Sequence, residues 1–236
     1  MGPDGEGDGQ AQVSVYFHRL GVDQEEDELV YAIEDSESRN PYGTVTEDGR
    51  YLILDIFEGY NENAVYYRDL GAPNGQVVRL LDDWDALYTF LGNDGPIFFF
   101  HTNKDAPRNR VVGIDIRRPD PQQWQEVIPQ AQETLESVSY VGEVFIGQYL
   151  KDANSLARLF SKGGDVLRDV AFPGIGTAGG FGGHADDSET FYSFQSYTVP
   201  PTLYRYDVVT GESSVYRETQ VDIDPSAYET IQVFYT

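Results

Sequence analysis

Side chains that could act as a nucleophile, a general base or a metal ligand are few in this chain. It has no cysteine, and its three histidines, His18, His101 and His184, each lie 83 residues from the next. The Gly-x-Ser-x-Gly pentapeptide, which presents the nucleophile in many serine hydrolases, does not occur in the sequence. Neither does a His-x-Glu or His-Glu-x-x-His metal-binding pattern. We therefore predict no catalytic residue, no metal and no cofactor in this chain, and histidines that are structural or exposed.

Two other patterns have a formal likeness to binding sites. Gly174-Ile-Gly-Thr-Ala-Gly179 matches the G-x-G-x-x-G fingerprint that holds a dinucleotide pyrophosphate at the start of a helix. The Gly-rich residues that follow cannot begin a stable helix, so we interpret the segment as a Gly-rich strand beside a narrow channel. The acidic run Asp23-Gln-Glu-Glu-Asp-Glu28 lacks the alternating spacing of a calcium loop, and we predict a solvated turn there.

The charge of the chain restricts its partners and suggests a habitat. Its 236 residues carry 40 acidic and 16 basic side chains, a formal net charge of −24, and only Lys104, Lys151 and Lys162 are lysines. Abundant carboxylates with few lysines favour an organism with high internal salt, although an ordinary acidic protein is the alternative. Nucleic acid and anionic membranes are not expected partners, because Arg117–Arg118 is the sole adjacent basic pair.

No segment of the sequence predicts membrane insertion or export. There is no apolar run of 18 residues, and the Gly- and Asp-rich stretch 1–12 lacks the apolar core of a signal peptide. We expect a soluble, cytoplasmic protein.

Short apolar and aromatic runs recur along the chain with a period of about 46 residues. Superposing Asp69, Asp115, Ser161 and Asp207 gives a constant step of 46. Turn signals separate the runs, and Asp48-Gly49 and Asp94-Gly95 suit the positive φ of a hairpin. The predicted strands, four to a unit, are 43–46, 51–57, 64–70 and 77–80; 86–91, 96–101, 110–116 and 123–127; 134–141, 143–150, 155–161 and 166–170; 174–183, 190–197, 202–208 and 214–217.

Four-stranded units repeating every 40 to 50 residues are typical of a β-propeller. The predicted fold class is therefore all-β, a β-propeller of about four four-stranded blades plus part of another. A β-solenoid would repeat at a shorter period, and a β-sandwich gives no reason for a constant step. We expect a disordered acidic leader at 1–12 and a partial propeller at 13–220. Its parts are a partial blade at 13–33 and blades at about 41–84, 85–128, 131–170 and 172–220, and one more strand is predicted at 230–235.

Eight stretches of the sequence carry a likeness to a known family in their order and spacing: 16–21, 23–27, 29–30, 48–52, 100–103, 187–194, 201–207 and 232–235. They resemble the propeller domain of the prolyl oligopeptidase (prolyl endopeptidase) family. The likeness runs from about residue 13 to 236 and implies an incomplete part of a seven-bladed ring. It also implies a serine peptidase that cleaves short peptides after proline.

In that family the Ser, Asp and His of the active site lie in an α/β-hydrolase domain that follows the propeller. The resemblance thus implies that residues 221–236 begin the connection to a hydrolase domain absent from this chain, which alone would be inactive. The implied partners are that hydrolase domain and short proline-containing peptides.

No catalytic position can be transferred from the family to this sequence. Where the family often has Glu-Gly-Cys on a cavity-facing turn near the substrate, this chain has Glu58-Gly59-Tyr60, which makes Tyr60 a candidate substrate-proximal residue. The leading hypothesis is the gating, substrate-filtering propeller of such a peptidase. The alternative is a stand-alone propeller-type binding or interaction module.

Overall fold

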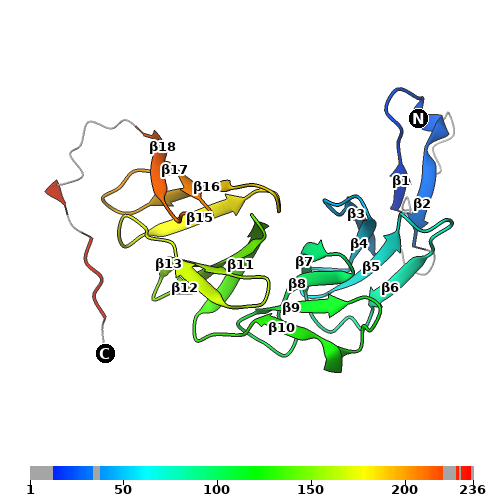
Figure 1. Ribbon diagram of the computed structural model, residues 1–236, viewed down its shortest axis with the longest axis horizontal. Helices are drawn as coiled ribbons and strands as arrows, with labels where there is room; N and C mark the ends of the chain where they lie inside the picture. Colours follow the sequence, from blue (N-terminus) through cyan, green and yellow to red (C-terminus); the bar gives the residue numbers. More distant parts are fainter. Residues whose placement is uncertain (1–12, 34–37, 220–226, 229, 235–236) are drawn as a thin grey trace, which may run out of the picture. The chain divides into compact units, whose positions relative to one another are not determined.

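The chain folds almost entirely into β-sheet. The computed structural model describes residues 13–33, 38–219, 227–228 and 230–234 (Figure 1). Within them lie four sheets of four strands and one of two, and within each sheet every strand pairs with the next in sequence. The prediction of four four-stranded blades plus part of another is confirmed. The chain divides into two compact units, unit 1 at Met1–Tyr88 and unit 2 at Thr89–Thr236.

Unit 1 packs a hairpin of two strands against one four-stranded blade. Val15, Val30 and Tyr31 of the hairpin contact a buried cluster that includes Leu54 and Tyr66 of the blade. The elements are β1 (Ser14–Phe17), the 3-10 turn η1 (Gln24–Glu26) and β2 (Glu28–Ala32), then β3 (Asn40–Val45), β4 (Tyr51–Phe57), β5 (Asn63–Asp69) and β6 (Val77–Leu81).

Unit 2 contains three blades. The boundary falls at the start of the first blade, because the first residue of its first strand, Tyr88, is the last residue of unit 1. The first blade has β7 (Tyr88–Asp94), β8 (Ile97–Thr102), β9 (Arg110–Asp115), the 3-10 turn η2 (Pro121–Gln123) and β10 (Gln125–Ile128). The second has β11 (Thr134–Val141), β12 (Val144–Lys151), β13 (Asn154–Phe160) and β14 (Val166–Asp169). The third has β15 (Thr177–Gly182), β16 (Glu189–Gln195), β17 (Thr202–Asp207) and β18 (Ser213–Glu218).

The blades of unit 2 are held together by aromatic side chains between their faces. Phe181 and Tyr192 stack with ring centroids 4.9 Å apart, and Tyr192 stacks on Tyr204 at 5.1 Å. These rings join Ile146 and Leu159 of the neighbouring blade in one buried cluster. The alternating in–out pattern of each strand therefore supplies apolar faces that are buried between adjacent sheets.

The four residues that recur at the constant step of 46 have the same role. Each one caps the turn after the third strand of its blade. Asp69 accepts a hydrogen bond from Gly71 N (2.9 Å), and Asp115 accepts one from Arg117 N (3.0 Å). Ser161 accepts from Asp165 N (3.1 Å), and Asp207 accepts from Val209 N and Thr210 N (2.9 and 2.7 Å). Each of the four side chains thus satisfies backbone donors where the chain reverses, as Asx and Ser/Thr turns do.

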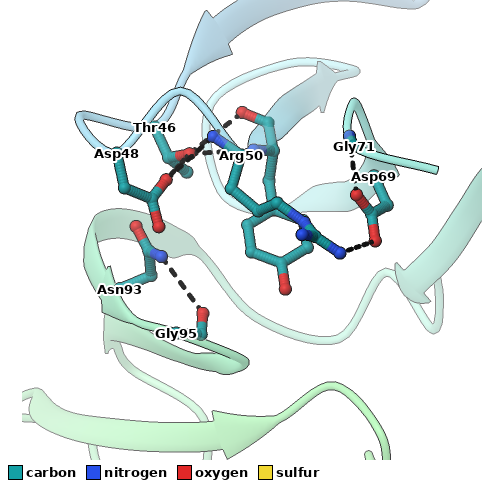
Figure 2. A network of polar contacts seen from close by, with 8 residues as sticks. Thr46, Asp48, Arg50, Asp69, Gly71, Asn93 and Gly95 are labelled. Atoms are coloured by element: carbon teal, nitrogen blue, oxygen red, sulfur yellow. Dashed lines mark hydrogen bonds and ion pairs between the residues drawn. The ribbon is translucent and has the colours of Figure 1, made fainter.

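In the blade of unit 1 this turn is also tied to the hairpin between β3 and β4 (Figure 2). Asp48 accepts hydrogen bonds from Thr46 Oγ1 (2.6 Å) and Arg50 N (3.0 Å), and Gly49 takes the predicted positive φ of 68°. Arg50 Nη2 then donates to Asp69 Oδ2 at 2.8 Å. The hydrogen bond from Arg50 lowers the pKa of Asp69 below its ordinary value.

Several strand predictions need correction. The strand expected at 43–46 begins at Asn40, the one expected at 86–91 ends at Asp94, and the Gly-rich one expected at 174–183 begins at Thr177, each three residues away from the prediction. The strand expected at 123–127 begins at Gln125, because Asp120 caps the 3-10 turn that precedes it by accepting from Gln122 N (2.9 Å). The strand expected at 190–197 ends at Gln195, since Ser196 begins a turn. Residues 230–234 of the strand expected at 230–235 are not in a strand, and the last residue of that prediction lies outside the described residues.

Candidate functional site

The three histidines lie on different elements. His18 Nδ1 lies 2.6 Å from Asp27 Oδ1 beside the β1–β2 turn, and 42% of its side chain is exposed. His101 in β8 donates from Nε2 to the backbone oxygen of Leu135 (3.1 Å), and burial lowers its pKa. His184 is exposed in the β15–β16 turn, where its backbone N–H donates to Asp187 Oδ2 (2.7 Å). None of these contacts pairs a histidine with a serine hydroxyl.

The G-x-G-x-x-G segment leads into strand β15 and does not begin a helix. A Cβ at Gly176 would lie 2.4 Å from Gln195 O, so this glycine permits the close approach of two backbone segments. The acidic run forms the exposed 3-10 turn η1, as predicted. Among the described residues, no three His, Asp or Glu side chains are grouped as a metal site would need.

The basic side chains that could have marked an anion site are paired with carboxylates. Arg117 donates to Asp115 from Nε (2.8 Å) and Nη2 (2.7 Å), and Arg118 lies 3.9 Å from the same carboxylate. Hydrogen bonding to Arg117 lowers the pKa of Asp115 to about 2. Lys162 Nζ lies 3.1 Å from Asp94 Oδ2. In the described part of the chain, no helix is long and apolar enough to cross a membrane.

Each blade also has a turn between its second and third strands. This turn lies at the end of the blade opposite to the capped turn, which follows the third strand, and we call that end the turn end of the blade. In unit 1 it contains Tyr60, which is 95% exposed. The neighbouring Glu58 accepts hydrogen bonds from Ser38 Oγ (2.6 Å) and Arg39 Nε (2.9 Å), which lower its pKa. The guanidinium of Arg39 lies 4.4 Å from the ring centroid of Trp84.

A buried asparagine fixes the base of this turn. Asn63 is 1% exposed, its Nδ2 donates to Tyr88 O (2.9 Å), and its Oδ1 accepts from Tyr88 N (2.7 Å). Both of its polar atoms are satisfied, so the turn rests on a rigid support. Tyr60 therefore extends into solvent from an ordered turn, and its contact with substrate stays a prediction.

The third blade of unit 2 presents a second exposed tyrosine at its turn end. Tyr197 follows β16 and is 100% exposed. The loop is ordered by Ser196 Oγ, which accepts from Thr198 N (3.1 Å) and Val199 N (2.9 Å). Sequence reasoning missed this residue, although Tyr60 and Tyr197 lie nearly three repeats apart and occupy equivalent turns.

The segment after the last blade is fastened to the turn ends of unit 2. Thr230 Oγ1 and Thr198 Oγ1 are 3.2 Å apart. Gln232 Nε2 donates to the backbone oxygen of Asp152 in the β12–β13 turn, and its Oε1 accepts from Asn154 Nδ2 (3.2 Å). The chain therefore leaves the last blade on the side of the turn ends.

Known proteins similar to this chain share its blades. A family model described as "Prolyl oligopeptidase, N-terminal beta-propeller domain" matches residues 3–219. The prolyl endopeptidase of Elizabethkingia miricola is 37% identical over 222 residues, which are 94% of this chain and 31% of that protein. Prolyl oligopeptidase A of Galerina marginata is 29% identical over 241 residues, covering 97% of this chain and 32% of that protein.

Two solved structures agree with these sequence matches. One, from a structural and mechanistic analysis of two prolyl endopeptidases, is 31% identical with a TM-score of 0.84, covering 94% of this chain and 32% of that one. The apo form of prolyl oligopeptidase B from Galerina marginata is 26% identical with a TM-score of 0.85, covering 94% and 33%. The chain thus spans about a third of the length of these relatives. Because the family model matches most of its residues and its blades have the corresponding fold, the chain belongs to the family of prolyl oligopeptidase N-terminal β-propeller domains.

Proposed function

We propose that this chain is the gating and substrate-filtering propeller of a serine peptidase that cleaves short peptides after proline. The observation that carries this proposal is the match of residues 3–219 to the propeller family of prolyl oligopeptidases. In the proposed enzyme the Ser, Asp and His belong to an α/β-hydrolase domain that follows residue 236. This propeller would contribute no reacting group, and such an enzyme would act in the cytoplasm, which cell fractionation would test.

Two features of the chain support a filtering role. The segment 230–234 lies along the turn ends of unit 2, so a domain that followed it would start beside these turns. A wall of packed blades beside an active site admits chains that are short and unfolded, and it keeps bulk water and folded proteins out. The net charge of −24 would add an electrostatic preference for peptides without excess negative charge.

The experiment compares this chain with a protein extended through the downstream coding sequence. Hydrolysis of a chromogenic Gly-Pro substrate is measured for both, in low and in molar salt. We expect activity in the extended protein alone, and faster cleavage of a proline-containing decapeptide than of a folded protein with exposed prolines. Activity in the short chain would contradict the absence of catalytic residues. Equal cleavage of the decapeptide and the folded protein would contradict filtering.

A further inference from the structure

An open pocket lies beside Tyr197 at the turn end of the third blade of unit 2. Its volume is about 300 Å³, which is room for one or two residues of a peptide. Its lining includes side chains from the turn after β16, from β15 and β16 and the residues before β15, from the neighbouring blade and from segment 230–234: Tyr197, Ile175, Thr177, Gln195, Asn154 and Thr230.

The aromatic wall of this pocket is exposed but ordered at its base. Tyr197 is 100% exposed and Ile175 is 39% exposed, so both present apolar surface to solvent. The loop that carries Tyr197 is closed by Ser196 N, which donates to Val199 O (2.9 Å), and by the hydrogen bonds to Ser196 Oγ. A large aromatic ring on an ordered loop loses little conformational entropy when it binds, which is why such rings dominate recognition surfaces.

Two polar side chains, one from each of two paired strands, form the floor of the pocket. Thr177 and Gln195 are directly paired across β15 and β16, so their side chains lie on the same face of the sheet. Both residues are exposed, so the amide of Gln195 is open to a ligand in the pocket. An amide supplies two donors and one acceptor oxygen, which match the C=O and N–H groups of an extended peptide.

We propose that this pocket is a binding subsite for a proline-containing peptide segment, with the proline ring on Tyr197 and the peptide backbone on Gln195. Aromatic side chains beside hydrogen-bonding groups are the usual way in which proteins recognise proline-rich segments, whose extended conformation is already formed. The inference rests on the proposed function and adds a contact on the propeller for further residues of the substrate. A subsite that holds further residues would favour substrates of several residues over dipeptides.

The first test measures binding and not hydrolysis. The 236-residue chain, in molar salt, is titrated with the peptide Ala-Pro-Ala-Pro-Ala and with pentaalanine, and amide NMR shifts of residues 175–177 and 195–197 are followed. We expect saturable shifts with the proline peptide alone. Tyr197→Ala should weaken binding about fivefold, the loss expected for one aromatic contact, and Tyr197→Phe should keep it. Tyr16→Ala, which removes an exposed tyrosine of unit 1, is the matched control and should change nothing.

Three results would overturn the proposal. They are equal binding of pentaalanine, an unchanged dissociation constant in Tyr197→Ala, and saturable shifts that avoid residues 175–177 and 195–197. A change of self-association in Tyr197→Ala without a change in peptide affinity would assign the surface to a second copy of the chain and would also overturn it.

The second test uses the extended protein. Tyr197→Ala should raise KM about fivefold for a decapeptide and leave KM for a chromogenic dipeptide unchanged. Equal changes for both substrates would assign Tyr197 to contacts with the following domain and would refute the subsite. Absence of prolyl hydrolysis would refute the proposed function, and the NMR titration would still decide the subsite.

Discussion

The two units of this chain bury their cores in different ways. Unit 1 packs a two-stranded hairpin on one blade around mainly aliphatic side chains, such as Leu54 and Ile56. Unit 2 packs full four-stranded sheets on one another around aromatic side chains, such as Phe181 and Tyr192. A two-stranded sheet covers less area, and Tyr16, Phe17 and Leu29 of the hairpin remain 56%, 54% and 58% exposed.

The hairpin of unit 1 should be the region of lowest local stability. Two strands are marginally stable without further partners, whereas sheets with two packed faces open rarely. We therefore expect unit 1 to tolerate opening of its hairpin and unit 2 to unfold as a block.

The strongest test of the aromatic core is Phe181→Ala. Phe181 is fully buried, and it occupies a bulge of β15 with φ of 63° between two glycines. Removing the ring should lower the free energy of unfolding of unit 2 by about 3–5 kcal/mol, as large-to-small changes in cores do. Denaturant unfolding measures the change. Phe191→Ala, on the opposite face of the neighbouring strand, is the control and should cost clearly less, because that ring is partly exposed. Equal losses of unfolding free energy in the two variants would mean that the buried ring of Phe181 stabilises the unit no more than the partly exposed ring of Phe191.

In unit 1, Asp55 of β4 places a carboxylate on the face of the strand opposite to Leu54 and Ile56. Burial raises its pKa to about 6, and its Oδ1 is buried without a hydrogen-bond partner in the described structure. A raised folded-state pKa means that the protonated form stabilises the fold below pH 4, and that this stability is lost as the pH rises through about 6. Two units of pKa correspond to about 2–3 kcal/mol.

Asp55→Asn should therefore make unit 1 more stable by about 2 kcal/mol at pH 8. It should also remove most of the decrease in stability that the wild type shows between pH 4 and 7. Hydrogen exchange of the β4 amides at several pH values measures it. Asp83→Asn, an exposed carboxylate of the same unit, is the control and should leave the profile unchanged. A wild-type profile that is flat from pH 4 to 8 would refute the raised pKa.

The smallest effect concerns the capped turns that both units share. Ser161→Ala removes the acceptor for Asp165 N and should cost about 1 kcal/mol. Ser161→Asp should recover only part of this loss. It restores an acceptor for Asp165 N, as in the other three blades, but it places a second carboxylate beside that of Asp165, to which Ser161 Oγ donates at 3.4 Å. Thermal unfolding of both variants measures the difference. Equal destabilisation by alanine and aspartate would show that the repeat at this position is not a capping requirement.

Much of the fold could be predicted from local patterns. The strands β4 and β11 have the predicted bounds, because alternating apolar residues and flanking turn residues act over a few positions. The strand ends at Gln125 and Gln195 were wrong by two residues, since Asp120 and Ser196 cap turns that the apolar pattern does not reveal. Tyr60 was named from a resemblance and its contact with substrate stays a prediction, whereas Tyr197 was not named from the sequence.

The repeat, the number of strands in each blade and the family could be read from the amino-acid sequence. These depend on residues close together in the chain, whose side chains alternate between two faces and whose turns need Gly, Asp or Ser. The contact of Gln232 with Asp152, 80 residues earlier, and the pocket that Ile175 and Tyr197 border are visible in the folded chain and not in the sequence. Such contacts arise from the packing of sheets against each other, which no local pattern encodes.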